Sequence, residues 1–266
     1  MTQELLVSSD NGIATVTMNR PASRNALTRA MVGALHTALT GFATDPSTRL
    51  IVLTGAGGAF CSGGDVKGFA QAAAGASAPM GFDQRVVDLR LRMEVSRLLH
   101  EIPKPTLAVL PGPAAGAGFS LALACDLRLA ADDAKLTTAF AKVGLSGDFG
   151  GSYFLSHLVG ASRARELYFT GRVVLADEAL RIGLVDRVVP ATQLQQATQD
   201  WANELAALPT VALGYMKRNL NLGLRATLSD VLDAEAVHMI RTFDTEDHKS
   251  AAQAFVDKRK PQFNGR

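Results

Sequence analysis

Two segments of the chain combine strand-like sequence with a loop of small residues, and together they could stabilise a developing negative charge. In residues 54–65 and 107–126, glycine and alanine follow an apolar run and lead into helix-like sequence. Small residues allow backbone to approach closely, and the first turn of a helix leaves N–H groups without intrahelical partners. Two such loops side by side would present two N–H donors to one oxygen, which is the arrangement of an oxyanion hole. A dinucleotide fold is not indicated, because neither loop has the G-x-G-x-x-G spacing.

An acid follows in a third glycine-rich stretch. Asp148 lies within residues 143–152, just ahead of a predicted helix. If this carboxyl group faces an apolar pocket, burial raises its pKa and makes it a better base. On the residues alone, an aspartate favoured by a glycine-rich turn is the preferred explanation of this position.

Several further motifs occur in a fixed order along nearly the whole chain, at residues 19–21, 25–27, 59–65, 103–105, 115–118, 125–126, 170–171, 176–185 and 255–259. As an ordered set they resemble the enoyl-CoA hydratase/isomerase (crotonase) superfamily. The resemblance implies an α/β fold, a crotonase-like spiral of ββα units with a helical C-terminal part that forms trimers. It divides the chain into a core at residues 1–195 and a helical region at residues 196–266. A homotrimer or a dimer of trimers is expected.

The same resemblance assigns the chemistry. The backbone N–H groups of Gly64 and Ala117 would hold the thioester oxygen of an acyl-CoA as it becomes an enolate. The two glutamates of the hydratases align with Ser120 and Phe140, neither of which is an acid or base at neutral pH. Some relatives instead carry an aspartate at the place of Asp148, and they include acyl-CoA isomerases.

The favoured activity is therefore the shift of a double bond in an enoyl-CoA by 1,3-proton transfer through a dienolate. Asp148 would move the proton, and no metal or redox cofactor is expected. Hydration of a 2-enoyl-CoA is the second reading, because Asp148 could handle water. A ring-directed or hydrolytic reaction on an acyl-CoA is the third. Loss of both hydratase carboxylates leaves open a catalytically silent binder of CoA esters.

Substrate-binding residues also follow from the resemblance. They are Arg24, Ala26, Leu27, Gly63 and Asp65 along the coenzyme A channel, Lys67 at a phosphate, Phe140 in the acyl pocket, and Phe255 with Lys258 as a C-terminal pair closing over the nucleotide, often from a neighbouring subunit. On charge alone, Lys258 reads as part of a solvated basic tail. Asp65 is expected to fix its loop, and Asp88 and Glu94 are alternative second acids.

Composition excludes several other classes. A net charge of +2 over 266 residues argues against a broad nucleic-acid surface. Cys61 and Cys125 form no C-x-x-C pair and the five histidines are scattered, so no metal site is expected, and two reduced thiols suit the cytoplasm. The N-terminus lacks the features of a signal peptide. Residues 106–125 are uncharged, but proline and glycine interrupt them, so no membrane helix is predicted.

Periodicity places the elements that must position these residues. A hairpin is predicted at residues 5–18 around Asn11 and Gly12, and a helix beyond Thr28. Strands are expected at 50–53, 106–110, 127–130, 136–138 and 184–189. Helices are expected from Asp65 and at 86–102, 152–159, 162–169, 176–182, 192–208, 211–220 and 228–245, with a surface segment at 70–80.

Overall fold

The computed structural model describes residues 3–65 and 81–266. Its main sheet has six strands in the order β1-β2-β3-β4-β6-β9, and a smaller sheet has the order β5-β7-β8. The strands of the main sheet are β1 (Leu5–Asp10), β2 (Ile13–Met18), β3 (Leu50–Gly55), β4 (Thr106–Leu110), β6 (Leu127–Ala131) and β9 (Arg187–Val189). Those of the smaller sheet are β5 (Ala114–Ala115), β7 (Lys135–Thr137) and β8 (Val174–Leu175). The predicted helix from Asp65 and the segment 70–80 lie outside the described residues.

The N-terminal hairpin forms as predicted. β1 and β2 pair antiparallel, and Asp10 lies opposite Ile13. Asn11 and Gly12 between them have φ of 49° and 80°. Positive φ at both central residues defines the turn that matches the twist of two antiparallel strands. The hairpin thereby fixes the edge of the main sheet.

From β2 onward the main sheet is parallel, and this places the two glycine loops together. β2 pairs parallel with β3, and β3 pairs parallel with β4, with Leu53 opposite Ala108. The carboxyl ends of parallel neighbours meet at the same edge of a sheet. The segments after β3 and β4 therefore leave the sheet side by side.

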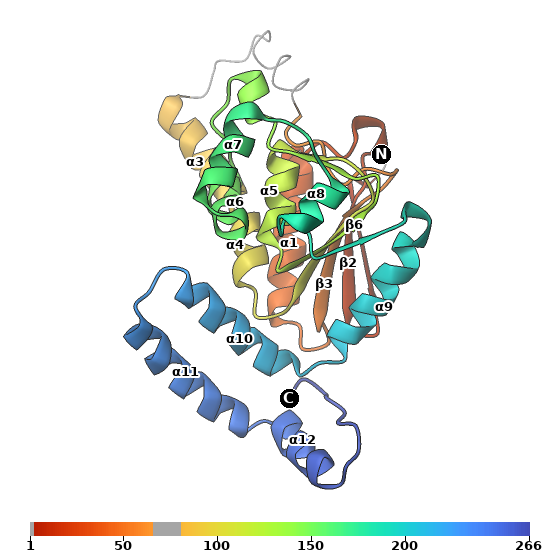
Figure 1. Ribbon diagram of the computed structural model, residues 1–266, viewed down its shortest axis with the longest axis vertical. Helices are drawn as coiled ribbons and strands as arrows, with labels where there is room; N and C mark the ends of the chain where they lie inside the picture. Colours follow the sequence, from red (N-terminus) through yellow and green to blue (C-terminus); the bar gives the residue numbers. More distant parts are fainter. Residues whose placement is uncertain (1–2, 66–80) are drawn as a thin grey trace.

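Helices cover both faces of this sheet (Figure 1). On one face lie α1 (Arg29–Thr44), α4 (Glu94–Glu101) and α5 (Gly116–Ala124), and on the other lies α9 (Leu194–Ala206). Successive residues of β3 point to opposite faces, because Ile51 joins the core with α1 while Val52 joins the core with Trp201 of α9. The boundary expected at residues 195–196 falls in the first turn of α9.

Local signals explain α1 and α5. The Thr28 side chain accepts a hydrogen bond from the Met31 N–H at 3.0 Å and caps α1, as predicted. Every residue of α5 is buried. A helix that is apolar all round belongs in the centre of a core, and this explains the uncharged segment at residues 106–125. None of the described helices is long and apolar enough to cross a bilayer.

The single helix predicted at residues 86–102 is wrong. The chain forms α3 (Phe82–Arg92) and α4, separated at Met93. Val95 and Leu99 of α4 are buried, whereas Val87 and Leu91 are 58% and 65% exposed on α3. The apolar periodicity continued across a change in helix direction, so it could not reveal the break.

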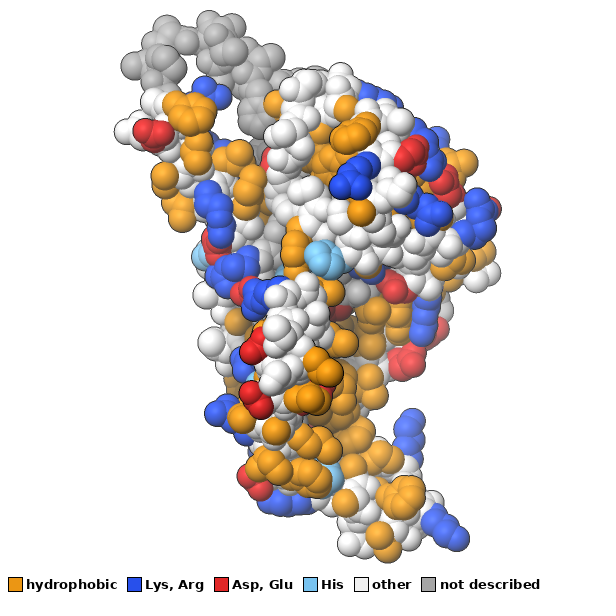
Figure 2. Space-filling view, turned by 60° about the vertical axis from the view of Figure 1, so that its left-hand side comes forward, with side chains coloured by type: hydrophobic (Ala, Val, Ile, Leu, Met, Phe, Trp, Pro, Cys, Tyr) orange, Lys and Arg blue, Asp and Glu red, His pale blue; other side chains and the backbone are white. Residues whose placement is uncertain are grey.

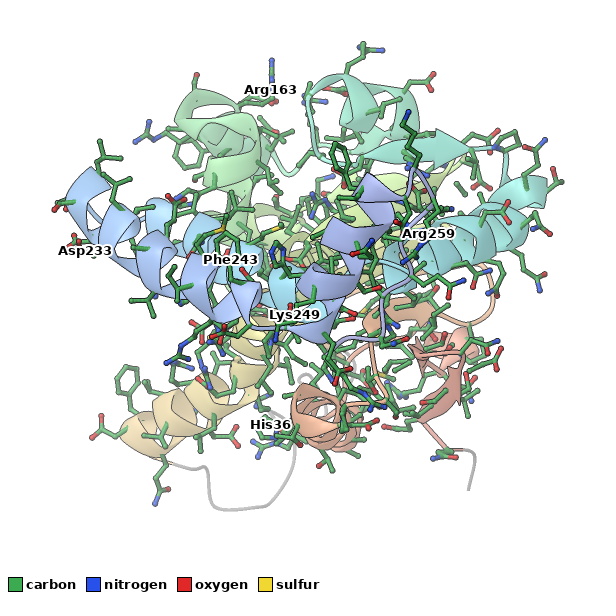
Figure 3. All side chains as sticks on the ribbon, turned by 90° about the horizontal axis from the view of Figure 1, so that it is seen from below. His36, Arg163, Asp233, Phe243, Lys249 and Arg259 are labelled. Atoms are coloured by element: carbon green, nitrogen blue, oxygen red, sulfur yellow. The ribbon has the colours of Figure 1, made fainter. Side chains whose placement is uncertain are left out.

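Further helices are α6 (Gly151–Val159), α7 (Ala161–Thr170) and α8 (Ala176–Arg181), followed by α10 (Thr210–Gly223), α11 (Leu228–Phe243) and α12 (Glu246–Val256). The last three form an arm that extends from the core (Figures 1 and 3). The prediction omitted α12, although Thr245 caps it and Glu246 and Asp247 occupy its first turn. No residue of α11 is buried, and apolar side chains gather on the surface of the arm (Figure 2).

Lys217 fastens the arm to the core, and its replacement should destabilise the fold. Its buried ammonium group donates to the Leu99 and Lys104 carbonyls at 2.9 and 3.2 Å and pairs with Asp126 at 2.7 Å. Lys217→Met keeps the volume but leaves a partly buried carboxylate without its cation. We expect the free energy of unfolding to fall by about 3 kcal/mol. Urea unfolding of this variant beside Lys249→Met, which removes an exposed lysine of α12, tests the expectation. Equal stability of the two variants would contradict it.

Candidate active site

The buried side chain of Asn25 holds the first glycine loop, at residues 56–65, through hydrogen bonds to its backbone. This residue is fully buried, and its side-chain amide donates to the carbonyls of Ala56, Ala59 and Phe60 at 2.9, 2.8 and 3.2 Å. Its side-chain oxygen accepts from the Arg20 N–H at 2.9 Å. One amide thus satisfies several backbone groups that a loop would otherwise bury unpaired. The loop after β3 is therefore held in one conformation.

The first loop then runs between two other backbone segments. The Leu27 N–H donates to the Gly63 carbonyl at 2.8 Å, and the Ala115 N–H donates to the Cys61 carbonyl at 2.9 Å. Gly63 has φ of 95°, and a β-carbon there would lie 2.9 Å from the Ala115 oxygen and 3.5 Å from the Ala117 nitrogen. The backbones of the two loops are therefore in van der Waals contact.

The second N–H donor stands at the start of α5. Gly116 has φ of 52° and begins the helix, which puts Ala117 in its first turn. A β-carbon on Gly118 would lie 2.5 Å from both the carbonyl oxygen and the β-carbon of Cys61, so only glycine allows this approach. In the described part of the chain, neither the Gly64 nor the Ala117 N–H donates a hydrogen bond within the protein. Two free donors on touching loops can hold one anionic oxygen.

The turn that carries Asp148 has an unusual backbone. Gly147, Phe149 and Gly150 have φ of 108°, 51° and 75°. Positive φ is costly for a residue with a side chain, so the surroundings must enforce it at Phe149. The buried Phe149 side chain anchors the turn in the core. Asp148 is thereby fixed just before α6.

The environment of Asp148 raises the pKa of its carboxyl group. Burial raises this pKa to about 6, although the positive charge of Arg92 on α3 opposes the change. Its Oδ1 is buried and has no hydrogen-bond partner among the residues that the structure describes. A carboxyl group with an elevated pKa and a free oxygen is suited to accept and return a proton.

Phe140 and Ser120 connect this turn to the second loop. The Phe140 ring lies 3.7 Å from a β-carbon built on Gly116 and 3.5 Å from one built on Gly147. The Ser120 hydroxyl donates to the Gly116 carbonyl at 3.2 Å. Asp148 and the start of α5 are thus neighbours across one aromatic ring and one serine.

The remaining residues predicted for the site fall into three groups. Arg24, Ala26 and Leu27 run beside the first loop, because the Arg24 carbonyl accepts from the Ser62 N–H at 2.9 Å and Leu27 bridges to Gly64. Asp65 accepts from both terminal nitrogens of Arg20 at 3.2 Å, which ties down the end of this loop. Lys67 lies outside the described residues. Phe255 in the last turn of α12 and Lys258 just beyond it are exposed, and within one chain α12 lies far from α5 and α6 (Figure 1).

The alternative acids, Glu94 and Asp88, form ion pairs with arginine side chains. Glu94 pairs with Arg90 and, at 2.5 Å, with Arg97, and hydrogen bonds from these two arginines lower its pKa. Asp88 pairs with Arg29 at 2.7 Å and Arg92 at 2.8 Å. The lowered pKa makes Glu94 a weak base, and both oxygens of Asp88 are occupied by ion pairs with arginine.

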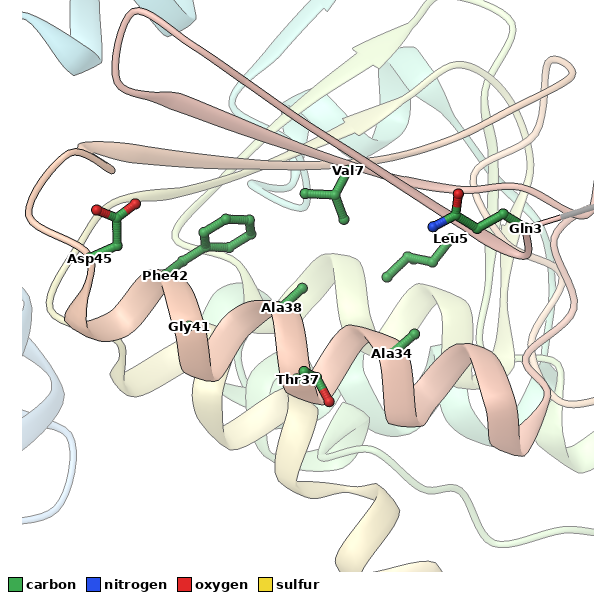
Figure 4. A pocket seen from close by; sticks show the side chains of 9 residues that line it. All are labelled: Gln3, Leu5, Val7, Ala34, Thr37, Ala38, Gly41, Phe42 and Asp45. Atoms are coloured by element: carbon green, nitrogen blue, oxygen red, sulfur yellow. The ribbon is translucent and has the colours of Figure 1, made fainter.

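Other candidate sites among the described residues lack a side chain suited to act as a base, a nucleophile or a metal ligand. A groove of about 640 Å³ lies between β1 and α1 (Figure 4). Asp45 is the acid at its end, and bonds from Ser47 and Thr48 lower its pKa. Burial raises the pKa of the Cys61 and Cys125 thiols to about 12, so both stay protonated. Among the described residues, no group of three His, Cys, Asp or Glu side chains could hold a metal ion.

Sequence reasoning missed two residues beside Asp148. Arg92 acts on it from α3, and Tyr168 of α7 stacks on Phe140 with ring centroids 6.1 Å apart. Both occur in ordinary helical sequence without a motif, so no local signal could have identified them.

Comparisons with known proteins identify the family of the chain. The model of the enoyl-CoA hydratase/isomerase family matches residues 8–266. A protein of Escherichia coli K12 named 1,2-epoxyphenylacetyl-CoA isomerase is 34% identical over 266 residues, covering 100% of both chains. The short-chain-enoyl-CoA hydratase of Clostridium acetobutylicum is 32% identical over 257 residues, covering 96% of this chain and 95% of its own. The crystal structure of an enoyl-CoA hydratase from Bacillus anthracis matches with a TM-score of 0.91 at 30% identity, covering 99% of this chain and 100% of that one.

The mixed α/β core with a helical C-terminal part is thus the crotonase fold, as the sequence predicted. The chain belongs to the enoyl-CoA hydratase/isomerase family and is an enzyme of that family. The names of its relatives include both an isomerase and hydratases, so they do not distinguish between the two reactions.

Proposed function

We propose that this enzyme shifts a double bond in an enoyl-CoA by 1,3-proton transfer. The observation that carries the proposal is Asp148, a carboxyl group with a free buried oxygen and a pKa raised to about 6. Asp148 removes a proton next to the thioester of a 3-enoyl-CoA and returns it two carbons away. The product is the 2-enoyl-CoA. One carboxyl group suffices for both steps, because the carboxylate that accepts the first proton becomes the acid that protonates the dienolate, and it can exchange its proton with solvent in between.

The charge that develops during this transfer needs a partner. Removal of the proton places negative charge on the thioester oxygen of the dienolate. The Gly64 and Ala117 N–H groups bind that oxygen, and each such donor is worth about 3 kcal/mol of transition-state stabilisation. The electrons only move along the carbon chain, so the reaction requires neither a metal nor a redox cofactor.

Hydration of a 2-enoyl-CoA is the second candidate. It is supported by the relatives named as hydratases, although this chain has Ser120 at a position where the hydratases carry a glutamate. Asp148 would then activate the water molecule. We favour isomerisation, because a hydroxyl group cannot replace a carboxylate as proton acceptor.

The proposed function also implies how coenzyme A is bound and how the subunits assemble. We infer that Arg24, Ala26, Leu27 and the backbone of residues 63–65 line the coenzyme A channel, and that Lys67 meets a phosphate. The exposed apolar side chains of α11 support assembly into a homotrimer or a dimer of trimers. In that assembly, Phe255 and Lys258 would close over the nucleotide of a neighbouring subunit. The two buried thiols support a reducing, cytoplasmic location.

The direct test offers a 3-enoyl-CoA and the matched 2-enoyl-CoA to the enzyme in heavy water. Interconversion without addition of water, with deuterium at the α or γ carbon, is the expected outcome. Formation of a 3-hydroxyacyl-CoA instead would make hydration the reaction. If neither thioester reacts or exchanges, aromatic CoA esters are the next substrates to try, and failure with them would overturn the proposal.

The proposal fixes the direction of the pH dependence. Asp148 must be ionised to act as a base, so kcat/KM should rise with pH and level off above a midpoint near 6. The charge of Arg92 lowers this pKa, and Arg92→Gln should therefore move the midpoint to higher pH. Arg90→Gln is the matched control, because Arg90 pairs with Glu94 instead. An unchanged midpoint of the kcat/KM profile in Arg92→Gln would contradict the prediction.

A further inference from the structure

The Tyr168 hydroxyl is a second buried group in the site for which the described residues provide no hydrogen-bond partner. Among the described residues, only four side chains have a buried polar atom without a hydrogen bond, and Tyr168 and Asp148 are two of them. Such groups are rare in folded proteins and call for an explanation. Tyr168 belongs to α7 and Asp148 to the turn before α6, so chain proximity does not explain their association.

The turn that carries Asp148 lies next to the Tyr168 hydroxyl. A β-carbon built on Gly147 would lie 3.4 Å from the Tyr168 oxygen, and one built on Gly151 would lie 2.5 Å from it. The hydroxyl therefore lies close to the turn on both sides of Asp148, at positions where glycine leaves room for it. The Phe140 ring, stacked on the Tyr168 ring at an interplanar angle of 15°, holds the phenol in this position.

The two unpaired groups are complementary. A phenol is a hydrogen-bond donor, and an ionised carboxylate accepts hydrogen bonds only. Ser120 Oγ lies 2.4 Å from the same built β-carbon of Gly151, but it already donates to the Gly116 carbonyl. Arg92 acts on Asp148 through its charge and makes its ion pair with Asp88. Of these three described neighbours of the turn, Tyr168 is therefore the donor without another hydrogen bond or ion pair.

We propose that, in the complex with substrate, the Tyr168 hydroxyl donates a hydrogen bond to Oδ1 of the ionised Asp148. The bond leaves the second carboxylate oxygen to face the carbon that loses its proton. Tyr168 is a positioning residue, and its role rests on the proposed function of Asp148. Burial and the charge of Asp148 raise the pKa of the phenol to about 12, so it keeps its proton while Asp148 exchanges one.

Tyr168→Phe tests the bond, because phenylalanine keeps the ring and its stacking on Phe140. A hydrogen bond to the ionised form of a carboxyl group lowers its pKa. The groups acting on Asp148 are Arg92 from α3 and Tyr168 from α7, and only the second changes. In Tyr168→Phe we expect the midpoint of the kcat profile to rise by about one pH unit and kcat to fall about 10-fold, with KM unchanged.

Ser120→Ala is the matched control, because it also removes one hydroxyl that touches Gly151. Its hydroxyl is already paired with Gly116, so the midpoint should stay in place. An unmoved midpoint in Tyr168→Phe, even with a slower enzyme, would overturn the proposal. Equal shifts in both variants would also overturn it, because they would report loosened packing of the turn.

A titration without turnover separates this proposal from the proposed reaction. Aspartate carboxyl groups are labelled with ¹³C, and the signal of Asp148 is identified by its loss in Asp148→Asn. The titration is followed with a non-reacting thioether analogue of the acyl-CoA bound. A higher Asp148 pKa in Tyr168→Phe supports the bond whatever reaction the enzyme performs, whereas an identical pKa refutes it. Failure of the reaction itself shows only in the substrate test in heavy water.

Discussion

Asp148→Asn should lose about 10³-fold in kcat while it continues to bind acyl-CoA, the largest effect that we expect from one side chain. Asparagine has nearly the same shape, but its amide cannot accept a proton from carbon. The Gly64 and Ala117 donors are backbone groups and stay in place. The measurement compares kcat for a 3-enoyl-CoA with the Kd of a thioether analogue, which should not change.

The same substitution should not harm the fold, and at alkaline pH it should help. The pKa of Asp148 is raised in the folded protein from 3.8 to about 6. A raised pKa means that ionisation is harder in the folded state, so the contribution of Asp148 to stability is fully present below pH 3.8 and is lost as pH rises through about 6. Asparagine never ionises. Asp148→Asn should therefore have the higher melting temperature above pH 6.

Asp133→Asn is the control for a general effect of removing one negative charge, because Asp133 is an exposed aspartate outside the site. It should retain full activity. Near-normal turnover in Asp148→Asn would remove Asp148 from the mechanism. The base would then have to be sought among other carboxyl groups, such as Asp88, which pairs with Arg29 and Arg92 in this structure.

Those parts of the fold that follow from neighbours in sequence were predictable. Asn11 and Gly12 specify their hairpin, and Thr28 specifies the start of α1, because a turn or a cap is a contact between nearby residues. The break at Met93 was not predictable, because it separates two stretches with the same apolar period. What turns α4 into the core and leaves α3 exposed is packing against distant elements.

In the site, too, some features could be recognised in the sequence, whereas others depend on contacts between distant residues. The two loops were identifiable, because a backbone contact such as that of Gly63 with Ala115 requires small residues and so leaves a trace in the sequence. The resemblance to a known family then singled out Asp148. The charge of Arg92 and the hydroxyl of Tyr168 left no trace, because a single side chain on a helix becomes informative only when the fold shows what it meets.

The second large effect on kcat is expected from Gly118→Ala, which adds a single methyl group. Gly118→Ala would put a β-carbon 2.5 Å from the carbonyl oxygen and the β-carbon of Cys61. The backbone oxygen cannot move without disturbing the bond from the Ala115 N–H, so the first turn of α5 must shift instead. In the proposed mechanism, the Ala117 N–H then no longer reaches the thioester oxygen that Gly64 also binds. Loss of one oxyanion donor predicts a fall in kcat of about 10²-fold to 10³-fold.

Gly33→Ala adds the same methyl group where it meets nothing, because a β-carbon at this exposed position of α1 has no atom within 4 Å. It should keep full activity and gain about 0.5–1 kcal/mol of stability, since alanine favours a helix over glycine. Melting temperature, kcat and the Kd of a thioether analogue are measured for both variants. A folded Gly118→Ala enzyme with normal kcat would mean that the contact with Cys61 does not position the Ala117 N–H. The Ala117 N–H would then be held by other contacts of α5, and the close packing of Gly118 would serve the core alone.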